Sequence, residues 1–257
     1  MISLTLNWFG IAMHNMPAAA QFYSNQLGLS FQEDAEKGLW RYFETRRMVF
    51  ELFAAQPARI HIEGWGRGQA FRPAFLVNNL STVEAHLQQI GVPVSREASE
   101  FGSRLEMTGP ESLRLSFVES QDVVTDWAHP LVGGIELKAA QLEAQRNFYV
   151  EVLGMSVAQR KGQAIHLTQT NGEAWLRMEP GGMPLSLPPE AGSRRPAFFY
   201  PIWISFETPD VTCAKDWLEG HDVKILQPLT HHEDWGGTDI IIADVDGNAI
   251  EIVQYQR

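Results

Sequence analysis

The stretch DVDGNAIEIVQY, residues 244–255, decides how the rest of the sequence is interpreted. Its DGN segment, residues 246–248, predicts a tight turn, because glycine and asparagine tolerate a positive φ angle. The alternation of Ile250 and Ile252 after the turn predicts a strand with one apolar face. Glu251 lies between them, on the opposite face of that strand. A carboxylate in the middle of a strand indicates a binding role, either to a metal ion with further ligands or to another group.

Length and composition bound the class of protein. The 257 residues suffice for one large domain or two of ordinary size. With 20 Lys and Arg against 31 Asp and Glu, the net charge of −11 disfavours binding to nucleic acid or to an anionic membrane surface. The one cysteine, Cys213, excludes an intramolecular disulfide and fits a reducing compartment. The N-terminus lacks the features of a signal peptide, and no apolar run reaches the roughly 20 residues that span a bilayer. We therefore expect a cytoplasmic protein with no nucleic-acid or membrane partner.

The sequence repeats itself. The segment AAQFYSNQLGL (19–29) recurs as AQRNFYVEVLGM (144–155), and the two Phe-Tyr pairs are 148 − 22 = 126 residues apart. The strand SLRLSFV (112–118) parallels AIEIVQY (249–255) in the same way. The sequence therefore predicts two diverged copies, a first domain at residues 1–120 and a second at 131–257, joined by a polar linker at 121–130.

Each copy divides again into two similar units. In the first copy the pattern predicts a strand at 6–12, a helix at 18–27 and strands at 39–44 and 48–53, and then begins again with a strand at 74–77 and a helix at 82–90. Gly28 and Gly154 stand where a glycine ends a helix. The second copy carries a Pro/Gly-rich insertion at 180–196, which is long enough for a lid or a packing arm.

These motifs resemble the vicinal oxygen chelate superfamily, which groups glyoxalase I, bleomycin-resistance proteins, fosfomycin-resistance enzymes and extradiol dioxygenases. The resemblance rests on FYxxxLG after a short helix, a WG before the penultimate strand and DxDGNxIEI at the end, and it covers nearly the whole chain twice. It implies an α+β fold of four tandem βαβββ modules in two glyoxalase-like domains, with each pair of modules forming a cup-shaped mixed sheet around a cavity. Function does not follow from this fold, because the fold hosts unrelated chemistries.

The resemblance also implies where metal ligands would lie, at the start of the opening strand and on the closing strand of each module. Counting back from the two Phe-Tyr pairs and aligning the second units assigns these positions. The opening strands give Trp8, Gly134, Arg72 and Trp203, and the closing strands give Glu51, Arg177, Arg114 and Glu251.

This set of residues argues against a metal at the usual position. A zinc site needs about three His, Cys or carboxylate ligands, and a non-haem iron site needs two histidines and a carboxylate. Glycine has no donor atom, and tryptophan and arginine offer only N–H groups. We therefore expect no metal and no other cofactor, with a displaced divalent metal as the alternative. The other histidine candidates are His166, on a predicted strand that faces a cup, and His231-His232, which we interpret as part of a polar loop.

The same positions describe a small-molecule pocket. Tryptophan offers a flat apolar wall, while arginine and glutamate offer a few placed polar contacts. A structural alternative stays open, in which Glu51 pairs with Arg114 and Glu251 with Arg177 as buried ion pairs. The expected ligand-binding residues are Trp8, Glu51, Arg72 and Arg114 in one cup and His166, Arg177, Trp203 and Glu251 in the other.

Two functions follow from this pattern. The first is a metal-free protein that binds or sequesters a small aromatic or cationic molecule. The second is a lyase, isomerase or dioxygenase of the same superfamily, which acts through a displaced metal or with Glu251 as the catalytic base. Either protein binds a small molecule, as a monomer with pseudo-dimeric domains or as a homodimer.

Overall fold

The computed structural model describes residues 2–34, 39–42, 48–54, 71–121, 130–169, 174–184, 202–233 and 235–256. The linker expected at 121–130 and the insertion expected at 180–196 lie for the most part outside the described residues. The side chain of Trp203 is also outside this part. Within it, no helix is both long and apolar enough to cross a membrane.

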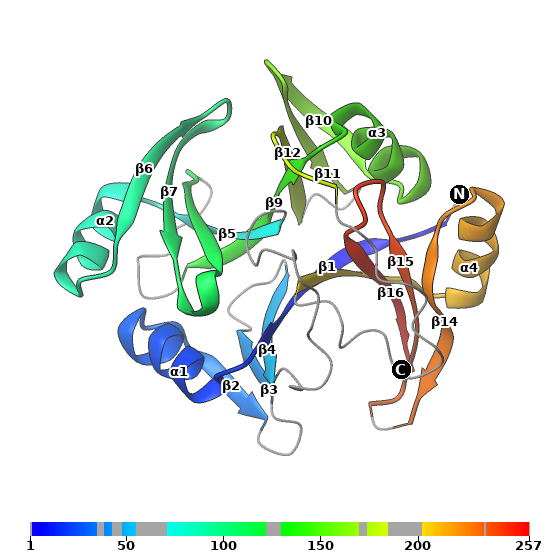
Figure 1. Ribbon diagram of the computed structural model, residues 1–257, viewed down its shortest axis with the longest axis horizontal. Coiled ribbons are helices and arrows are strands. Elements are labelled where there is room, and N and C mark those ends of the chain that lie inside the picture. Colours follow the sequence, from blue (N-terminus) through cyan, green and yellow to red (C-terminus); the bar gives the residue numbers. More distant parts are fainter. Residues whose placement is uncertain are drawn as a thin grey trace.

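The chain folds into two eight-stranded mixed sheets (Figure 1). Sheet 1 has the order β14 (Ile225–His232), β15 (Gly237–Ala243), β16 (Ala249–Tyr255), β13 (Ile202–Glu207), β1 (Thr5–Met13), β4 (Val49–Ala54), β3 (Leu39–Tyr42) and β2 (Phe31–Asp34). Sheet 2 has the order β10 (Ser156–Lys161), β11 (Ala164–Thr168), β12 (Trp175–Pro180), β9 (Leu131–Ala139), β5 (Phe71–Val77), β8 (Arg114–Glu119), β7 (Gly102–Thr108) and β6 (Val94–Ser99).

Four βαβββ modules account for every strand, as the resemblance implied. They comprise β1–β4, β5–β8, β9–β12 and β13–β16, and each has its helix after the opening strand. The helical segments are α1 (Met16–Ala20) with the π-helix η1 (Gln21–Gln26), α2 (Leu80–Gln89), α3 (Leu142–Asn147) with the π-helix η4 (Phe148–Val152), and α4 (Val211–Gly220); a 3₁₀ turn, η3 (Pro110–Ser112), precedes β8.

The pairing of modules differs from the expectation. Each cup was expected to form within one copy, but β1 pairs with β13 and β5 pairs with β9, so each sheet joins a module from the first copy to a module from the second. The blue β1 accordingly belongs to the same sheet as the red β16 (Figure 1), with β13 between them, and not to the sheet of β5. Both arrangements bury the same alternating faces, and a local apolar pattern therefore cannot distinguish them.

The repeated Phe-Tyr motif anchors the helices to the sheets. Tyr23 and Tyr149 are fully buried in one continuous core with Phe9, Phe75 and Ile250. Both helices that carry the motif end at a glycine with positive φ, as predicted, with φ +69° at Gly28 and +75° at Gly154. The strand β2 was not predicted, because its sequence FQED lacks an alternating apolar pattern.

The DxDGN turn joins the two sheets. Asp244 accepts hydrogen bonds from the backbone N–H groups of Asp246 and Asn248 and from the Tyr149 hydroxyl at 3.2 Å. Asp246 accepts one from the backbone N–H of Ala140 at 2.7 Å. Tyr149 and Ala140 belong to the module of β9–β12, which lies in the other sheet. The motif that indicated the fold therefore holds the two sheets together.

Candidate functional site

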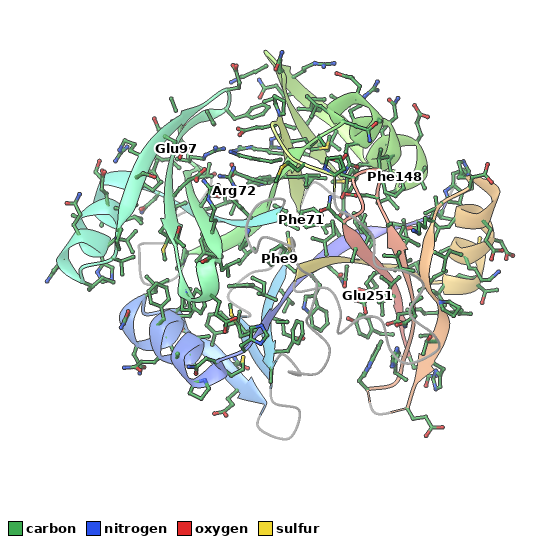
Figure 2. The ribbon with its side chains drawn as sticks, viewed as in Figure 1. Phe9, Phe71, Arg72, Glu97, Phe148 and Glu251 are labelled. Carbon is green, nitrogen blue, oxygen red and sulfur yellow. The ribbon has the colours of Figure 1, made fainter. Side chains whose placement is uncertain are left out.

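Each sheet has one face that packs against the helices and one that faces away from them, which we call the inner face. Alternation along β1 and β16 places Phe9, Ile11 and Ile250 on the helix side. Trp8 and Glu251 therefore lie on the inner face of sheet 1. Figure 2 shows Glu251 there and Arg72 in the other sheet.

The inner face of sheet 1 collects residues that the sequence had placed in different cups. Glu51 on β4 is paired with Gly10 on β1, and Gly10 is in turn paired with Trp203 on β13. Trp8 is paired with Ser205, and Ser205 with Glu251. The assignment of Trp8 and Glu51 to one cup and Trp203 and Glu251 to the other is therefore wrong, because modules from both copies build each sheet.

Glu251 forms an acid pair with Asp239 on the adjacent strand β15. The Ser205 hydroxyl donates a hydrogen bond to Glu251, and Gln227 Nε2 donates one to Asp239 Oδ1 at 2.8 Å. Burial, and then the neighbouring Asp239 carboxylate, raise the pKa of Glu251 to about 8, against the opposing effect of the Ser205 hydrogen bond. At neutral pH this carboxyl group therefore carries a proton that the two acids share.

His232 completes the polar cluster on the side of β14. Its Nε2 lies 3.1 Å from Asp239 Oδ2, and its ring stacks on Trp235 with centroids 4.7 Å apart. His231 and His232 were interpreted as a loop, but both lie on strand β14. They point to opposite faces, as strand geometry requires, so that His231 is exposed and His232 is buried.

Aromatic rings border this acid pair. Trp8 stacks on Tyr255 with centroids 6.4 Å apart, and Tyr255 meets Trp235 edge to face at 5.7 Å. Trp8, Tyr255 and Trp235 are each partly exposed. Together with His232 they form an aromatic row, which offers flat apolar surface next to the acids.

Sheet 2 presents a different inner face, filled by ion pairs. Arg72, which is 1% exposed, contacts both Glu106 and Glu136. Arg104 lies at the centre, and its ion-pair distances are 3.2 Å to Glu97, 3.0 Å to Glu106, 3.3 Å to Glu136 and 2.9 Å to Glu179. Arg114 also contacts Glu106.

Arg177 and His166 lie beside this network. Arg177 Nε donates a hydrogen bond to His166 Nδ1 at 3.1 Å, and its guanidinium lies 4.3 Å from the Trp175 ring centroid and 5.1 Å from that of Phe101. Burial, and then the positive charge of Arg177, lower the pKa of His166 to about 4. The imidazole is therefore neutral at physiological pH and accepts the hydrogen bond from Arg177.

Neither expected ion pair forms. Glu51 and Glu251 belong to sheet 1, whereas Arg114 and Arg177 belong to sheet 2. Buried ion pairs do form in sheet 2, but with Glu106 and Glu136 as the acids. Sequence spacing does not connect Arg72 and Arg114 to Glu106 and Glu136, because these acids lie on other strands, β7 and β9.

The equivalence of Arg114 and Glu251 is wrong by two residues. The turn before β16 is closed by the Asp244 N–H and the Asn248 carbonyl, and the turn before β8 by the Gly109 N–H and the Leu113 carbonyl. Counting three residues onward from Asn248 gives Glu251, and from Leu113 it gives Ser116. The register agrees, since Ser205 pairs with Glu251 as Ala74 pairs with Ser116.

The residues at the family's ligand positions do not fit a zinc or iron site. In sheet 1 both carboxylates, Glu51 and Glu251, are present, but tryptophans stand at the two histidine positions and supply no lone pair. In sheet 2 the positions carry Arg72, Gly134, Ser116 and Arg177. Among the described residues, no group of three or more His, Cys, Asp or Glu side chains is arranged to hold a metal ion.

The raised pKa of Glu251 predicts a specific pH dependence of stability. The folded protein binds this proton more tightly than the unfolded chain, so the free energy of unfolding falls as the pH rises between the ordinary value of 4.5 and about 8. Replacing Glu251 with Gln removes this decline, which we expect to be on the order of 3 kcal/mol. Urea unfolding of both proteins at pH 5, 6.5 and 8.5 measures it. A difference in stability between the two proteins that stays constant over this range would contradict the raised pKa.

Paired βαβββ modules in two mixed sheets define the class of protein. Residues 132–252 match the model of the Glyoxalase/Bleomycin resistance protein/Dioxygenase superfamily, which confirms the expected family resemblance for this part of the chain.

Solved structures share the fold over the whole chain. Glyoxalase I from Zea mays is similar at 14% identity, with 98% of this chain and 92% of that chain covered and a TM-score of 0.69. The cppA protein from Streptococcus pneumoniae is similar at 11% identity, with 98% and 99% covered and a TM-score of 0.55. A search of curated proteins finds no significant match.

Sequence reasoning missed three polar residues around Glu251, namely Ser205, Gln227 and Asp239, and placed a fourth, His232, in a loop. Asp239 carried a usable signal, because it lies on the face of β15 opposite to Ile240 and Ile242. Glu251 lies in the same way opposite to Ile250 and Ile252 on β16. Ser205 and Gln227 carried no such signal, since isolated polar residues on strands are common.

Proposed function

We propose that this protein binds a small aromatic molecule on the inner face of sheet 1 and does so without a metal ion. The observation that carries the proposal is the aromatic row of Trp8, Tyr255 and Trp235 beside the acid pair of Asp239 and Glu251. Broad rings next to a few placed polar groups are typical of small-molecule sites.

The contrast with sheet 2 supports the assignment to sheet 1. Ion pairs occupy the inner face of sheet 2, where the charges of its acids and bases already compensate one another. Gly134, which corresponds to Trp8, has the Trp175 ring against it, and a Cβ atom there would lie 2.3 Å from the Trp175 carbonyl oxygen. A ligand would have to displace these groups, whereas the rings in sheet 1 are partly exposed.

A fluorescence titration tests this proposal. Purified protein titrated with a panel of aromatic compounds should show saturable quenching of tryptophan emission. Replacing Trp8 with Ala should weaken the affinity about tenfold, the equivalent of about 1.4 kcal/mol of ring contact. Replacing Trp217 with Phe provides the control, because that ring lies on α4, on the helix side of sheet 1, and its loss should leave the affinity unchanged. Equal affinities for the wild type and the Trp8→Ala protein would contradict the proposal.

A second candidate function is acid–base catalysis by Glu251. It is favoured by a pKa of about 8, because a carboxyl group that titrates near neutral pH both accepts and donates protons efficiently. For any lyase or isomerase substrate that the wild type converts, Glu251→Gln should lower kcat by about 100-fold or more. Unchanged turnover in that variant would exclude this role.

A further inference from the structure

We propose that the acid pair of Asp239 and Glu251 binds an organic cation, an ammonium group on an aromatic body, which takes the place of the proton that the two carboxyl groups share. This inference rests on the proposed function, because it names the chemical class of the ligand for the same face of sheet 1.

The cluster contains a buried hydrogen-bond acceptor that has no donor among the described residues. Asp239 and Glu251 are diagonal neighbours on β15 and β16, with Glu251 opposite Ile241 and Asp239 opposite Val253. Gln227 is only 2% exposed, and its Nε2 donates to Asp239. Its carbonyl oxygen, Oε1, is fully buried and has no hydrogen-bond partner among the described residues. The amide cannot simply rotate, because that would place Oε1 against the Asp239 carboxylate.

A buried acceptor without a donor is unfavourable, and it marks where a donor belongs. A primary ammonium group supplies three N–H donors and one positive charge. The two carboxyl groups and the Gln227 carbonyl offer acceptors of the type that such a group requires. Ser205, the remaining polar neighbour, already donates its hydroxyl to Glu251.

The charges around the pair favour a cation. Glu251 faces Asp239 on β15, His232 on β14 and Ser205 on β13, and Glu207 lies farther along β13, where it accepts a hydrogen bond from Asn7. This set holds three acidic side chains, Asp239, Glu251 and Glu207, against one imidazole, that of His232. Two adjacent carboxyl groups cannot both ionise at low cost, so one proton stays between them until another cation replaces it.

The aromatic row determines which kind of cation fits. Trp8, Tyr255 and Trp235 present rings at the border of the cluster, and ring faces attract ammonium groups as well as apolar bodies. No group of His, Cys, Asp and Glu side chains among the described residues is arranged for a metal ion. An ammonium ion with an aromatic body uses both the acids and the rings, whereas a bare divalent ion uses only the acids.

Binding of this kind releases a proton. The protonated pair and R–NH₃⁺ combine to give the doubly ionised pair with R–NH₃⁺ bound, and the displaced proton passes to the buffer. Below the pKa of Glu251 the proton competes with the ligand, so the affinity for the cation should rise by up to about tenfold for each pH unit between 6 and 8.

Calorimetric titrations with three probes that share one ring system test the proposal, namely 1-naphthylmethylammonium, 1-naphthylmethanol and 1-naphthoate. At pH 7 the ammonium probe should bind at least tenfold more tightly than the alcohol, and the carboxylate should bind most weakly. Titrations in phosphate and in Tris, which differ in ionisation enthalpy, should reveal the release of nearly one proton for the ammonium probe and none for the alcohol.

The variant Glu251→Gln should lose the preference for the ammonium probe and the proton release while it keeps the affinity for the alcohol. Retained alcohol binding shows that the variant is folded. If the alcohol binds as tightly as the ammonium probe to the wild type and Trp8→Ala weakens both, the proposed function stands and this inference fails. If no probe binds, both fail. Stoichiometric binding of Mn²⁺ that is lost in Glu251→Gln would also overturn the inference, because it would assign the acids to a metal ion.

Discussion

Replacing Arg104 with methionine is expected to lower the free energy of unfolding by about 3 to 5 kcal/mol. The Arg104 side chain is 5% exposed and forms ion pairs with Glu97, Glu106, Glu136 and Glu179 on β6, β7, β9 and β12. Burial lowers the pKa of Arg104, but the surrounding carboxylates, with Glu136 first, raise it well above its ordinary value overall. Methionine fills much of the volume but removes the cation that two buried carboxylates, Glu106 and Glu136, share.

A matched control lies on the neighbouring strand. Arg96 pairs with Glu84 at 2.6 Å, but both side chains are substantially exposed. Exposed pairs contribute little, so Arg96→Met should change the stability by less than about 1 kcal/mol. Urea unfolding followed by tryptophan fluorescence and circular dichroism measures both variants. Similar small losses in the two proteins would show that the network in sheet 2 is not a buried unit.

Replacing Gly134 with alanine is expected to cost at least about 3 kcal/mol, since overpacking against a backbone atom cannot be relieved by a rotamer change. A Cβ atom at Gly134 would lie 2.3 Å from the carbonyl oxygen of Trp175 and 2.4 Å from its ring. Strands β9 and β12 pair at this point, so the ladder itself would have to move apart. The Trp175 ring, which contacts Arg177 and His166, would move with it.

Gly220 provides the control for this substitution. It lies at the end of α4, and a Cβ atom there meets no atom within 4 Å. Gly220→Ala should therefore be neutral or stabilise by a few tenths of a kcal/mol through the lower entropy of the unfolded chain. Thermal unfolding of both variants gives the comparison. If the Gly134→Ala protein were as stable as the wild type, the contact between β9 and β12 at Gly134 would have to be wider than in the structure, and the prediction would fail.

Much of the fold could be predicted because its signals are local. The alternation of Ile250 and Ile252 gives the correct faces of β16, and the glycines after the Phe-Tyr motifs end both helices as expected. The same alternation assigned Glu251 correctly to the face away from the helices. The alternation of Asp239 with Ile240 and Ile242 on β15 carries the same local signal.

The site was predicted less completely, because its residues come together only through long-range pairing. Glu251 was expected to meet Arg177, but β16 and β12 lie in different sheets. Its partners are instead Ser205 on β13 and Asp239 on β15. A shift of two residues in one turn was enough to equate Arg114 with Glu251, since both registers keep the apolar residues on the same face.

The sequence by itself determined the duplication, the four modules, the faces of their strands and the absence of histidine from the expected ligand positions, because each of these depends on residue type at a local spacing. Only the tertiary structure decided which modules pair. That pairing set an acid pair and an aromatic row on the inner face of sheet 1 and a closed ion-pair network on that of sheet 2. The physical reason is that the backbone groups along a strand edge can form hydrogen bonds with any strand of matching register. Which strand pairs there depends on side chains that meet only in the folded protein.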